Sequence, residues 1–193
     1  MTTIGWIRHG ATEWNKLGRL QGQNDIPLNR EGREQAHALG ERLKNEHWDL
    51  IVSSDLCRAR ETAEIIAEKL QNVPVLLDKR LRERTHGRLD GTTLEERIAV
   101  WGEDWHRLDH GIETDDELYS RGIACVNDLE AAHSGKNILV VSHGAFIAVM
   151  LQRMLERMPE GLLQNTSVSV IEKGKAGWHC RLFNCTKHLN TVR

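Results

Sequence analysis

The chain has 193 residues, the size of one domain or two small ones, and is long enough to bury a hydrophobic core. Hydrophobic residues make up 39% of the sequence and charged residues 28%, a balance that excludes a membrane protein and a disordered chain. Lysine and arginine number 26 against 28 aspartate and glutamate, so a formal net charge of -2 provides no general basic field for nucleic acid or an anionic membrane. Any anion must be bound by a local cluster.

Short apolar runs alternate with helical patterns along the chain. Four runs are short and apolar enough to form strands buried on both faces of a sheet, and they span residues 4–7, 49–53, 73–77 and 137–142. Apolar residues at helical spacing predict helices over residues 30–46, 55–71, 115–133 and 145–157. This alternation predicts a mostly parallel sheet whose two faces are covered by helices.

Two further apolar runs, residues 167–172 and 178–183, flank a glycine-containing turn and predict an antiparallel hairpin at one edge of the sheet. The predicted fold class is therefore α/β, with three layers (α/β/α), a mostly parallel central sheet and one antiparallel edge hairpin. No linker divides the sequence, so residues 1–193 are predicted to form a single domain. The least regular stretch, about residues 87–116, is predicted to form a short cap.

Polar and charged residues follow the predicted strands at the points where the strands end. Arg8 and His9 come directly after the first strand, and His143 follows the fourth. Arg58 lies a few residues beyond the second strand, and Glu83 a few residues beyond the third. Because ligands of open α/β sheets bind beyond the carboxyl ends of the strands, we expect these five residues to meet at one rim.

The residue types at this rim are suited to phosphoryl transfer. Arginine presents a planar fork of N–H donors that matches phosphate oxygens, and helix N-termini add further N–H groups and a positive dipole end. A neutral imidazole in such a site can attack phosphorus and form a phosphohistidine, and a carboxylic acid can then protonate the leaving oxygen. These steps require neither a metal ion nor an organic cofactor, and we expect none.

Motifs in a fixed order run from the first strand to the last helix. They are Arg8-His9-Gly10 with Thr12, Trp14 and Asn15; Gly18-Arg19-Leu20-Gln21-Gly22; Ser53-Ser54 with Arg58, Glu61 and Thr62; Leu81, Glu83 and Gly87; and Ser142-His143-Gly144. Over about residues 4–150 the sequence thereby resembles the histidine phosphatase superfamily, in its phosphoglycerate mutase-like branch. An Arg-His-Gly triplet alone would be weak evidence, whereas the ordered set is specific.

The resemblance implies a role for each residue at the rim. His9 would accept the phosphoryl group, Glu83 would protonate the leaving group and later activate water, and the remaining catalytic residues would bind phosphate. The catalytic residues implied are His9, Glu83, Arg8, Arg58 and His143. The residues implied in contacts with phosphate or substrate are Asn15, Gln21, Gly144 and His86.

Differences from the mutase pattern favour hydrolysis. Mutases carry an acidic or amide residue followed by Ser after Arg-His-Gly, and a pair of arginines in a long insertion that grips phosphoglycerate. This sequence has Ala11-Thr12 at the first place and no Arg-Arg pair in the insertion. A short cap would leave the phosphohistidine open to water. We therefore predict a metal-independent phosphatase acting on small phosphomonoesters, similar in look to small bacterial broad-specificity phosphatases.

Two alternative enzymes and one further class of protein stay open at this point. The enzymes are a cofactor-dependent phosphoglycerate mutase and a phosphoserine-specific phosphatase. His86 favours the second, because metal-independent phosphoserine phosphatases of the family carry His at this place. A module that binds phosphate without catalysis is the third hypothesis, and the presence of every catalytic residue type argues against it.

Four arginines around Glu83 either bind a substrate carboxylate or second phosphate, or form a solvated charge run. They are Arg80, Arg82, Arg84 and Arg88. His106 and His110 have helical spacing but no third ligand nearby, so we interpret them as cap residues and predict no metal site.

The cellular setting and the partners are predicted from general features. Four cysteines without a CxxC pair are typical of reduced thiols, and the first residues resemble no export signal, so we expect a cytoplasmic location. The expected partner is a small-molecule phosphate ester, with no nucleic acid and no membrane. The apolar helices and the tryptophan-rich cap would allow a homodimer, although nothing specifies one.

Overall fold

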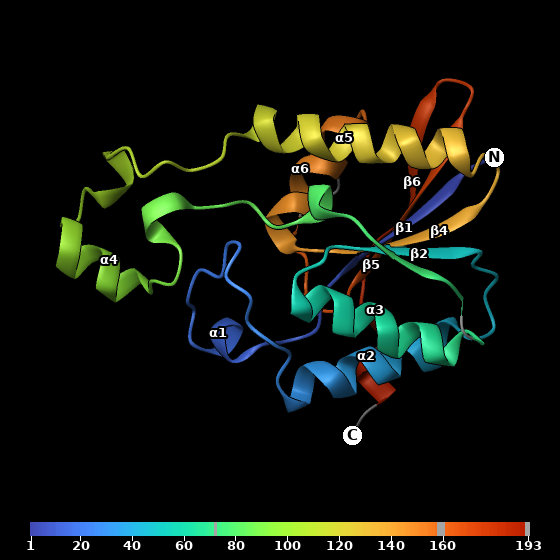
Figure 1. The fold of residues 1–193 in the computed structure, drawn as a ribbon, viewed down its shortest axis with the longest axis horizontal. Coiled ribbons are helices and arrows are strands. Elements are labelled where there is room, and N and C mark those ends of the chain that lie inside the picture. Colours follow the sequence, from blue (N-terminus) through green and yellow to red (C-terminus); the bar gives the residue numbers. More distant parts are fainter. Residues whose placement is uncertain (72, 158–160, 192–193) are drawn as a thin grey trace.

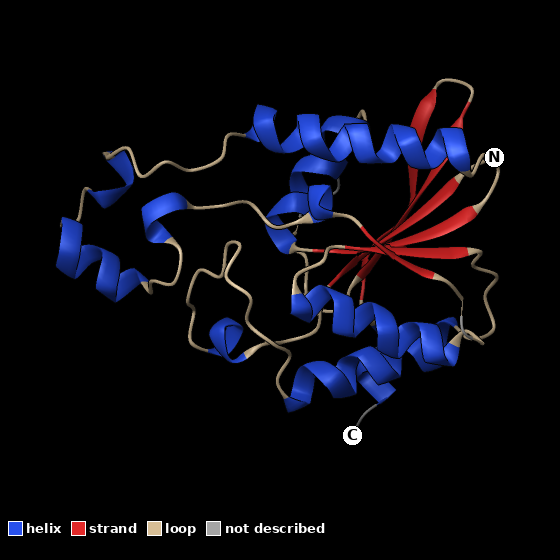
Figure 2. Ribbon diagram, in the orientation of Figure 1, coloured by secondary structure: helices blue, strands red, loops and turns tan. Residues whose placement is uncertain are grey.

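A six-stranded sheet with helices on both faces forms the body of the computed structural model, which describes residues 1–71, 73–157 and 161–191 (Figures 1 and 2). The strands are β1 (Thr3–Arg8), β2 (Leu50–Ser53), β3 (Val75–Leu77), β4 (Asn137–Ser142), β5 (Val168–Gly174) and β6 (Gly177–Cys185). Their order is β3-β2-β4-β1-β5-β6, with the first four parallel to one another and the β5–β6 hairpin antiparallel. The predicted fold class is confirmed.

Four long helices cover the sheet, and shorter ones lie in the loops. The α-helices are α1 (Glu13–Lys16), α2 (Arg30–Leu43), α3 (Cys57–Lys69), α4 (Leu94–Trp101), α5 (Asp115–Ala132) and α6 (Gly144–Met154). The 3-10 helices are η1 (Lys79–Leu81), η2 (Gly87–Leu89), η3 (Trp105–Arg107) and η4 (Lys187–Thr191). Among the described residues, no helix combines the length and the apolar character needed to cross a membrane.

The two short helices α1 and α4 were not predicted, although each begins with a capping box. The Thr12 side chain accepts a hydrogen bond from the backbone N–H of Asn15, and the Asn15 side chain accepts one from the backbone N–H of Thr12. Thr93 and Glu96 form the same pair of bonds at the start of α4. The predicted end of the last helix at residue 157 was wrong. The α6 helix ends at Met154 because Leu155 has extended backbone and bridges to Trp178 of β6.

Two hydrophobic layers enclose the sheet, as the alternation of side chains along a strand requires. Ile4 and Trp6 of β1 pack in one layer with residues of α5 and α6. Ile7 packs in the other with residues of α2 and α3. Figure 1 shows these helix pairs on opposite faces of the sheet. A Cβ at Gly5 would lie 2.9 Å from the Trp48 ring, so glycine is needed for close packing there.

The third strand is an exception to the predicted burial on both faces. β3 lies at the edge of the sheet and pairs with β2 only. Leu76 and Leu77 are consequently 48% and 49% exposed. An apolar run indicates a strand, but its place in the sheet depends on strand order, which periodicity does not specify.

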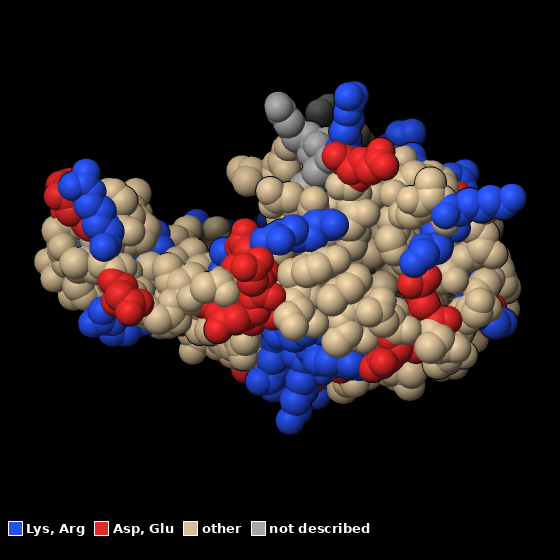
Figure 3. Space-filling model, turned by 90° about the horizontal axis from the view of Figure 1, so that it is seen from above, with Lys and Arg blue, Asp and Glu red and all other residues tan. Residues whose placement is uncertain are grey.

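The segment from η2 to α5 extends away from the sheet and carries α4 and η3 (Figure 1). In Figure 3 it forms a lobe at one end of the molecule. The backbone of Leu20 joins it by two bonds, because its N–H donates to Thr92 and its carbonyl accepts from Gly91. These residues lie within the stretch predicted to be a cap, and the division into one domain with a cap stays a prediction.

Candidate active site

The predicted site residues lie around a single cavity at the carboxyl ends of the parallel strands. The cavity measures about 410 Å³. Its predicted lining residues are Arg8, His9, Asn15, Gln21, Arg58, Glu83, His86 and Gly144. His143 is wholly buried and places its ring centroid 5.2 Å from that of His9. Residues from the first, second and fourth strand ends and from the loop after β3 thus meet as expected.

His9 is buried at the end of β1 and is held in one tautomer. Its Nδ1 lies 2.7 Å from the carbonyl oxygen of Gly10, which can only accept, so Nδ1 carries the proton and Nε2 keeps its lone pair. Burial, followed by the charges of Arg58 and Arg8, holds the pKa of His9 well below its usual value of 6.5. The ring is therefore a neutral base with one free nitrogen.

The loop after His9 is fixed by close packing against α2 and α3. The Gly10 N–H donates to Thr62 Oγ1 at 3.1 Å, and a Cβ on Gly10 would lie 2.4 Å from the Gly32 carbonyl oxygen. Only glycine fits there. Two residues on, Thr12 caps α1, and its N–H donates to Asn15 Oδ1 at 3.1 Å. Because that oxygen is engaged within the loop, the NH₂ group is the part of Asn15 that can bind a ligand.

Arg8 and Arg58 bring positive charge into the cavity, and within the described residues neither forms an ion pair with a carboxylate, although the charge of Glu83 acts on both. Arg8 Nη1 donates to the Leu163 carbonyl at 2.6 Å, and Arg58 donates to the carbonyls of Asn24 and Gly22 at 2.7 and 2.8 Å. In the described part of the chain the Nε of each arginine is buried without a hydrogen bond. Burial lowers the pKa of both side chains. Buried cations with donors to spare form an anion site.

His143 is the N-cap residue of α6, and its ring lies next to that of His9. Its Nε2 is 2.9 Å from Ser54 Oγ, and Ser54 Oγ already accepts from the Leu56 N–H. The hydroxyl can thus donate to Nε2, which leaves the proton on Nδ1, a buried atom with no partner among the described residues. Burial, then the charges of Arg58 and His9, holds the pKa of His143 well below 6.5.

Glu83 replaces a conventional cap at the start of α6, where the His143 side chain makes no capping bond. Its carboxylate accepts from the Phe146 N–H at 2.9 Å and the Ala145 N–H at 3.2 Å, and from the Arg84 N–H at 2.8 Å. A carboxylate is stabilised at this end of a helix. The carboxyl group is thereby held in the wall of the cavity.

Two other predicted residues, Gln21 and His86, also line the cavity. The Gln21 side chain is buried, and its Oε1 lacks a partner within the described residues. His86 Nδ1 lies 3.1 Å from Asp90 Oδ1. Burial raises the pKa of Asp90, but hydrogen bonds from His86 and Thr85 outweigh that effect and lower it. An ionised Asp90 orients the His86 ring.

The four arginines around Glu83 are not brought to the cavity. Arg80 pairs with Asp78 and Asp128 at 2.7 Å each, and Arg82 pairs with Asp55 at 2.7 Å. Arg84 pairs with Asp115, and Arg88 donates to the Asp109 carbonyl. Each therefore has a partner within the chain, in agreement with a surface charge run.

The two cap histidines are likewise structural. His110 is buried, places Nε2 2.6 Å from the Trp105 carbonyl and lies against Trp101 with 5.0 Å between ring centroids. His106 is exposed. Across residues 1–71, 73–157 and 161–191, no three metal-ligating side chains gather in one place.

Two residues near the site were missed from the sequence. Asn165 Nδ2 donates to the His9 carbonyl at 2.9 Å and lies 3.4 Å from Asn15 Oδ1. Arg121 on α5 donates to the Glu83 carbonyl at 3.2 Å. Both lie far from the motifs along the chain, and neither follows a strand end. The positive φ of 55° at Thr166 fixes the loop that holds Asn165, and no sequence pattern predicts it.

The comparisons with known proteins agree with this geometry. The family model for the histidine phosphatase superfamily (branch 1) matches residues 4–186. An uncharacterized phosphatase, PhoE, of Bacillus subtilis is 36% identical over 193 residues, covering 98% of each chain. A metal-independent phosphoserine phosphatase of Arabidopsis thaliana is 32% identical over 202 residues, covering 100% of this chain and 85% of the relative. The solved structure of YhfR from Bacillus stearothermophilus superimposes with a TM-score of 0.87 at 28% identity, covering 98% of this chain and 100% of that one.

Proposed function

Because the chain belongs to branch 1 of the histidine phosphatase superfamily, we propose that it is a metal-independent phosphatase that hydrolyses small phosphomonoesters through a phosphohistidine on His9. The observation that supports this most strongly is the pairing of a neutral His9, whose Nε2 carries no proton, with two arginines, Arg8 and Arg58, that are bonded to backbone carbonyls and form no ion pair within the described residues. The arginines can bind a phosphate group, and the imidazole can attack it.

In the first step the Nε2 lone pair of His9 forms a bond to phosphorus while the ester P–O bond breaks. Arg8, Arg58 and the Nδ1–H of His143 donate to the phosphoryl oxygens, where negative charge is concentrated in the transition state. The Asn15 amide and the backbone N–H of Gly144 add further donors. Glu83 in its protonated form gives its proton to the leaving oxygen, which departs as an alcohol.

In the second step water replaces the alcohol. The Glu83 carboxylate removes a proton from water, the resulting oxygen nucleophile attacks phosphorus, and the P–Nε2 bond breaks. Inorganic phosphate is released and His9 returns to its neutral form. The Nδ1–H of His9 stays on the Gly10 carbonyl throughout, so the ring does not need to reorient between the steps.

A phosphoserine-type substrate is a second candidate, and His86 supports it. The Asp90 contact orients this ring in the cavity wall. It could therefore bind the part of the substrate that leaves. The Arabidopsis relative is named a metal-independent phosphoserine phosphatase. Mutase activity is less well supported, because the insertion has no pair of adjacent arginines.

The test is phosphate release from a panel of esters in excess EDTA, with phosphoserine, 3-phosphoglycerate, a sugar phosphate and p-nitrophenyl phosphate. We expect release to persist in EDTA and to fall at least about 10⁴-fold in His9→Ala, since covalent catalysis is lost. His37→Ala is the matched control, because His37 is an exposed residue of α2. No release from any ester, or full release by His9→Ala, would overturn the proposal.

We also propose a cytoplasmic location and action as a single domain with a short cap. The four cysteines are unpaired in the structure, which supports a reducing compartment. The homodimer stays a prediction.

A further inference from the structure

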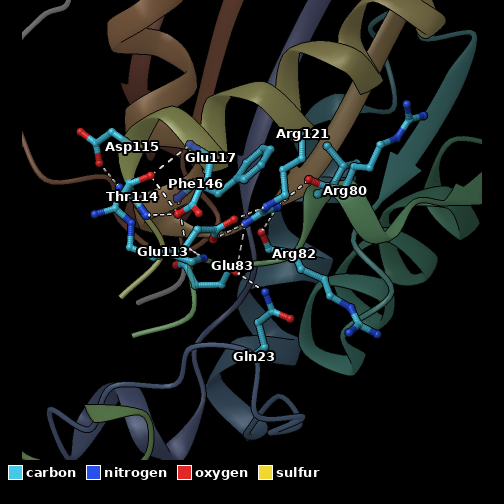
Figure 4. A network of polar contacts seen from close by, with 12 residues as sticks. Gln23, Arg80, Arg82, Glu83, Glu113, Thr114, Asp115, Glu117, Arg121 and Phe146 are labelled. Atoms are coloured by element: carbon cyan, nitrogen blue, oxygen red, sulfur yellow. Dashed lines mark hydrogen bonds and ion pairs between the residues drawn. The ribbon is translucent and has the colours of Figure 1, made fainter. Parts of the chain in front are cut away.

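The arginine on α5 that contacts the Glu83 loop commits all of its hydrogen-bond donors. Arg121 Nη1 donates to the carbonyls of Arg80 and Arg82 at 2.6 and 2.7 Å, and Nη2 donates to the Glu83 carbonyl at 3.2 Å. Nε and Nη2 also donate to the two oxygens of Glu113, at 2.7 and 2.9 Å. A guanidinium has five N–H donors, and these are five bonds. Figure 4 shows the network.

The same guanidinium also lies against the residue that binds the Glu83 carboxylate. Its Cζ is 5.0 Å from the centroid of the Phe146 ring. The backbone N–H of Phe146 donates to Glu83 Oε1 at 2.9 Å. Arg121 thus contacts both the main chain of Glu83 and the α6 residue that holds its side chain. Gln23 adds one bond to the Glu83 carbonyl, at 3.1 Å, from the opposite side.

Glu113 fixes the guanidinium in this position. The Arg121 and Glu113 side chains are only 20% and 13% exposed, and the two-bond contact holds the guanidinium plane in one orientation. Arg121 therefore has no donor left for a substrate. Its effect on the reaction must be exerted through the residues that it holds.

We propose that Arg121, fixed by Glu113, is the positioning residue for the general acid Glu83, a role that rests on the proposed function. The loop after η1 has no strand or helix to hold it at residues 82–86. The hydrogen bonds from Arg121 to the carbonyls of this loop replace those of regular secondary structure. They fix the position of Glu83 relative to the first residues of α6. A shift of about 1 Å in a catalytic group can cost about 100-fold in rate.

The test exploits the leaving group. A nitrophenolate departs without a proton, whereas the alkoxide of glycerol phosphate needs one, so loss of Glu83 positioning slows the first step, measured as kcat/KM, selectively for glycerol phosphate. The variants are Arg121→Lys, which keeps the charge but not the fork, Arg121→Met, and Glu113→Gln. Arg153→Met is the matched control, because Arg153 also pairs with a carboxylate, Asp116, and lies 5.9 Å from the Tyr119 ring, but on the exposed surface.

We expect Arg121→Lys to lower kcat/KM for glycerol phosphate about 100-fold and kcat/KM for p-nitrophenyl phosphate less than about 5-fold, because kcat/KM reports the transfer to His9 and not the later attack of water. Arg153→Met should match the wild type on both substrates. Adding Arg121→Lys to Glu83→Gln should cause no further loss on glycerol phosphate, because a residue that acts through the Glu83 carboxyl has no effect once that carboxyl is removed. Glu113→Gln should show the same selectivity to a smaller extent, and it replaces the Arg121 variants if their melting temperatures show that they do not fold.

Equal losses of kcat/KM on the two substrates in a folded variant, or a further loss when Arg121→Lys is added to Glu83→Gln, would show that Arg121 is only structural. The wild-type enzyme separates this result from a failure of the proposed function. If wild type releases no phosphate from either ester, the phosphatase proposal falls and the role of Arg121 falls with it.

Discussion

Arg8 and Arg58 in the cavity have different partners from Arg80 and Arg82 in the loop around Glu83. In the cavity, Arg8 and Arg58 are bonded to backbone carbonyls, and each has a buried Nε with no partner among the described residues. In the loop around Glu83, Arg80 and Arg82 are each bound to aspartates. Figure 3 likewise shows basic side chains next to acidic ones on one face of the molecule. Arg8 and Arg58 are thus held by neutral carbonyls and form no ion pair within the described residues, which makes them the candidates for anion binding, and the number of arginines in a segment does not reveal this difference.

The strongest test of this comparison removes one arginine from each region. We expect Arg58→Met to lower kcat/KM about 10² to 10³-fold, because a preorganised donor to the transition state is lost. Arg82→Met should change kcat/KM less than about 3-fold, because its guanidinium is already neutralised by Asp55. Steady-state kinetics with p-nitrophenyl phosphate measures both, and melting temperatures confirm folding. Similar losses of kcat/KM in the two variants would show that the arginines of the cavity and of the loop do not differ in their contribution to the reaction.

The two regions should also respond to acid in different pH ranges. His9 and His143 have pKa values well below 6.5 in the folded state, so only the unfolded chain takes up protons as the pH falls below 6.5. The contribution of the two neutral rings to the free energy of unfolding is complete above pH 6.5. Below pH 6.5 it is lost by up to about 1.4 kcal/mol per pH unit for each ring.

The ion-paired loop behaves differently. Hydrogen bonds from Arg80 and Arg82 lower the pKa of Asp78 and Asp55 below 3.8, so the stability from these pairs is retained until the pH falls below about 4. Urea unfolding between pH 4 and 8 should show that the free energy of unfolding falls as the pH drops below 6.5. His143→Gln should make this fall less steep, because one of the two buried rings is removed. The acid limb of kcat/KM that His9 causes should lie well below pH 6.5, and a limb centred at 6.5 would contradict a neutral, buried His9.

The smallest expected effect concerns the surface pairs. Arg80→Gln breaks contacts with Asp78 and Asp128, and the Asp128 side chain is 69% exposed. We expect the free energy of unfolding to fall by less than about 1 kcal/mol, with unchanged inhibition by inorganic phosphate. Urea denaturation and an inhibition assay check this. Weaker inhibition by phosphate would show that Arg80 takes part in phosphate binding. The arginines of the loop would then differ less from those of the cavity than we propose.

The ends of the strands were predictable because they depend on local patterns. Apolar runs located β1, β2 and β4, and the residues that follow them are the ones that line the cavity or lie beneath it. The general rule that ligands bind at the carboxyl ends of strands then predicts that His9 and His143 lie close together. The exposure of Leu76 and Leu77 was not predictable, since the order of strands decides which one lies at the edge.

By itself, the sequence determined the α/β alternation, the family motifs and the predicted residues that line the cavity, because hydrophobic periodicity and strand ends are local properties of the chain. Only the tertiary structure decided which arginines have donors without a partner among the described residues, which tautomer His9 adopts, and that Asn165 and Arg121 donate to the carbonyls of His9 and Glu83. Each of these depends on contacts between residues far apart in sequence. Such contacts are set by the packing of whole helices and strands. A partner that lies far away along the chain, whether neutral or charged, does not change the pattern of residues around the group that it contacts.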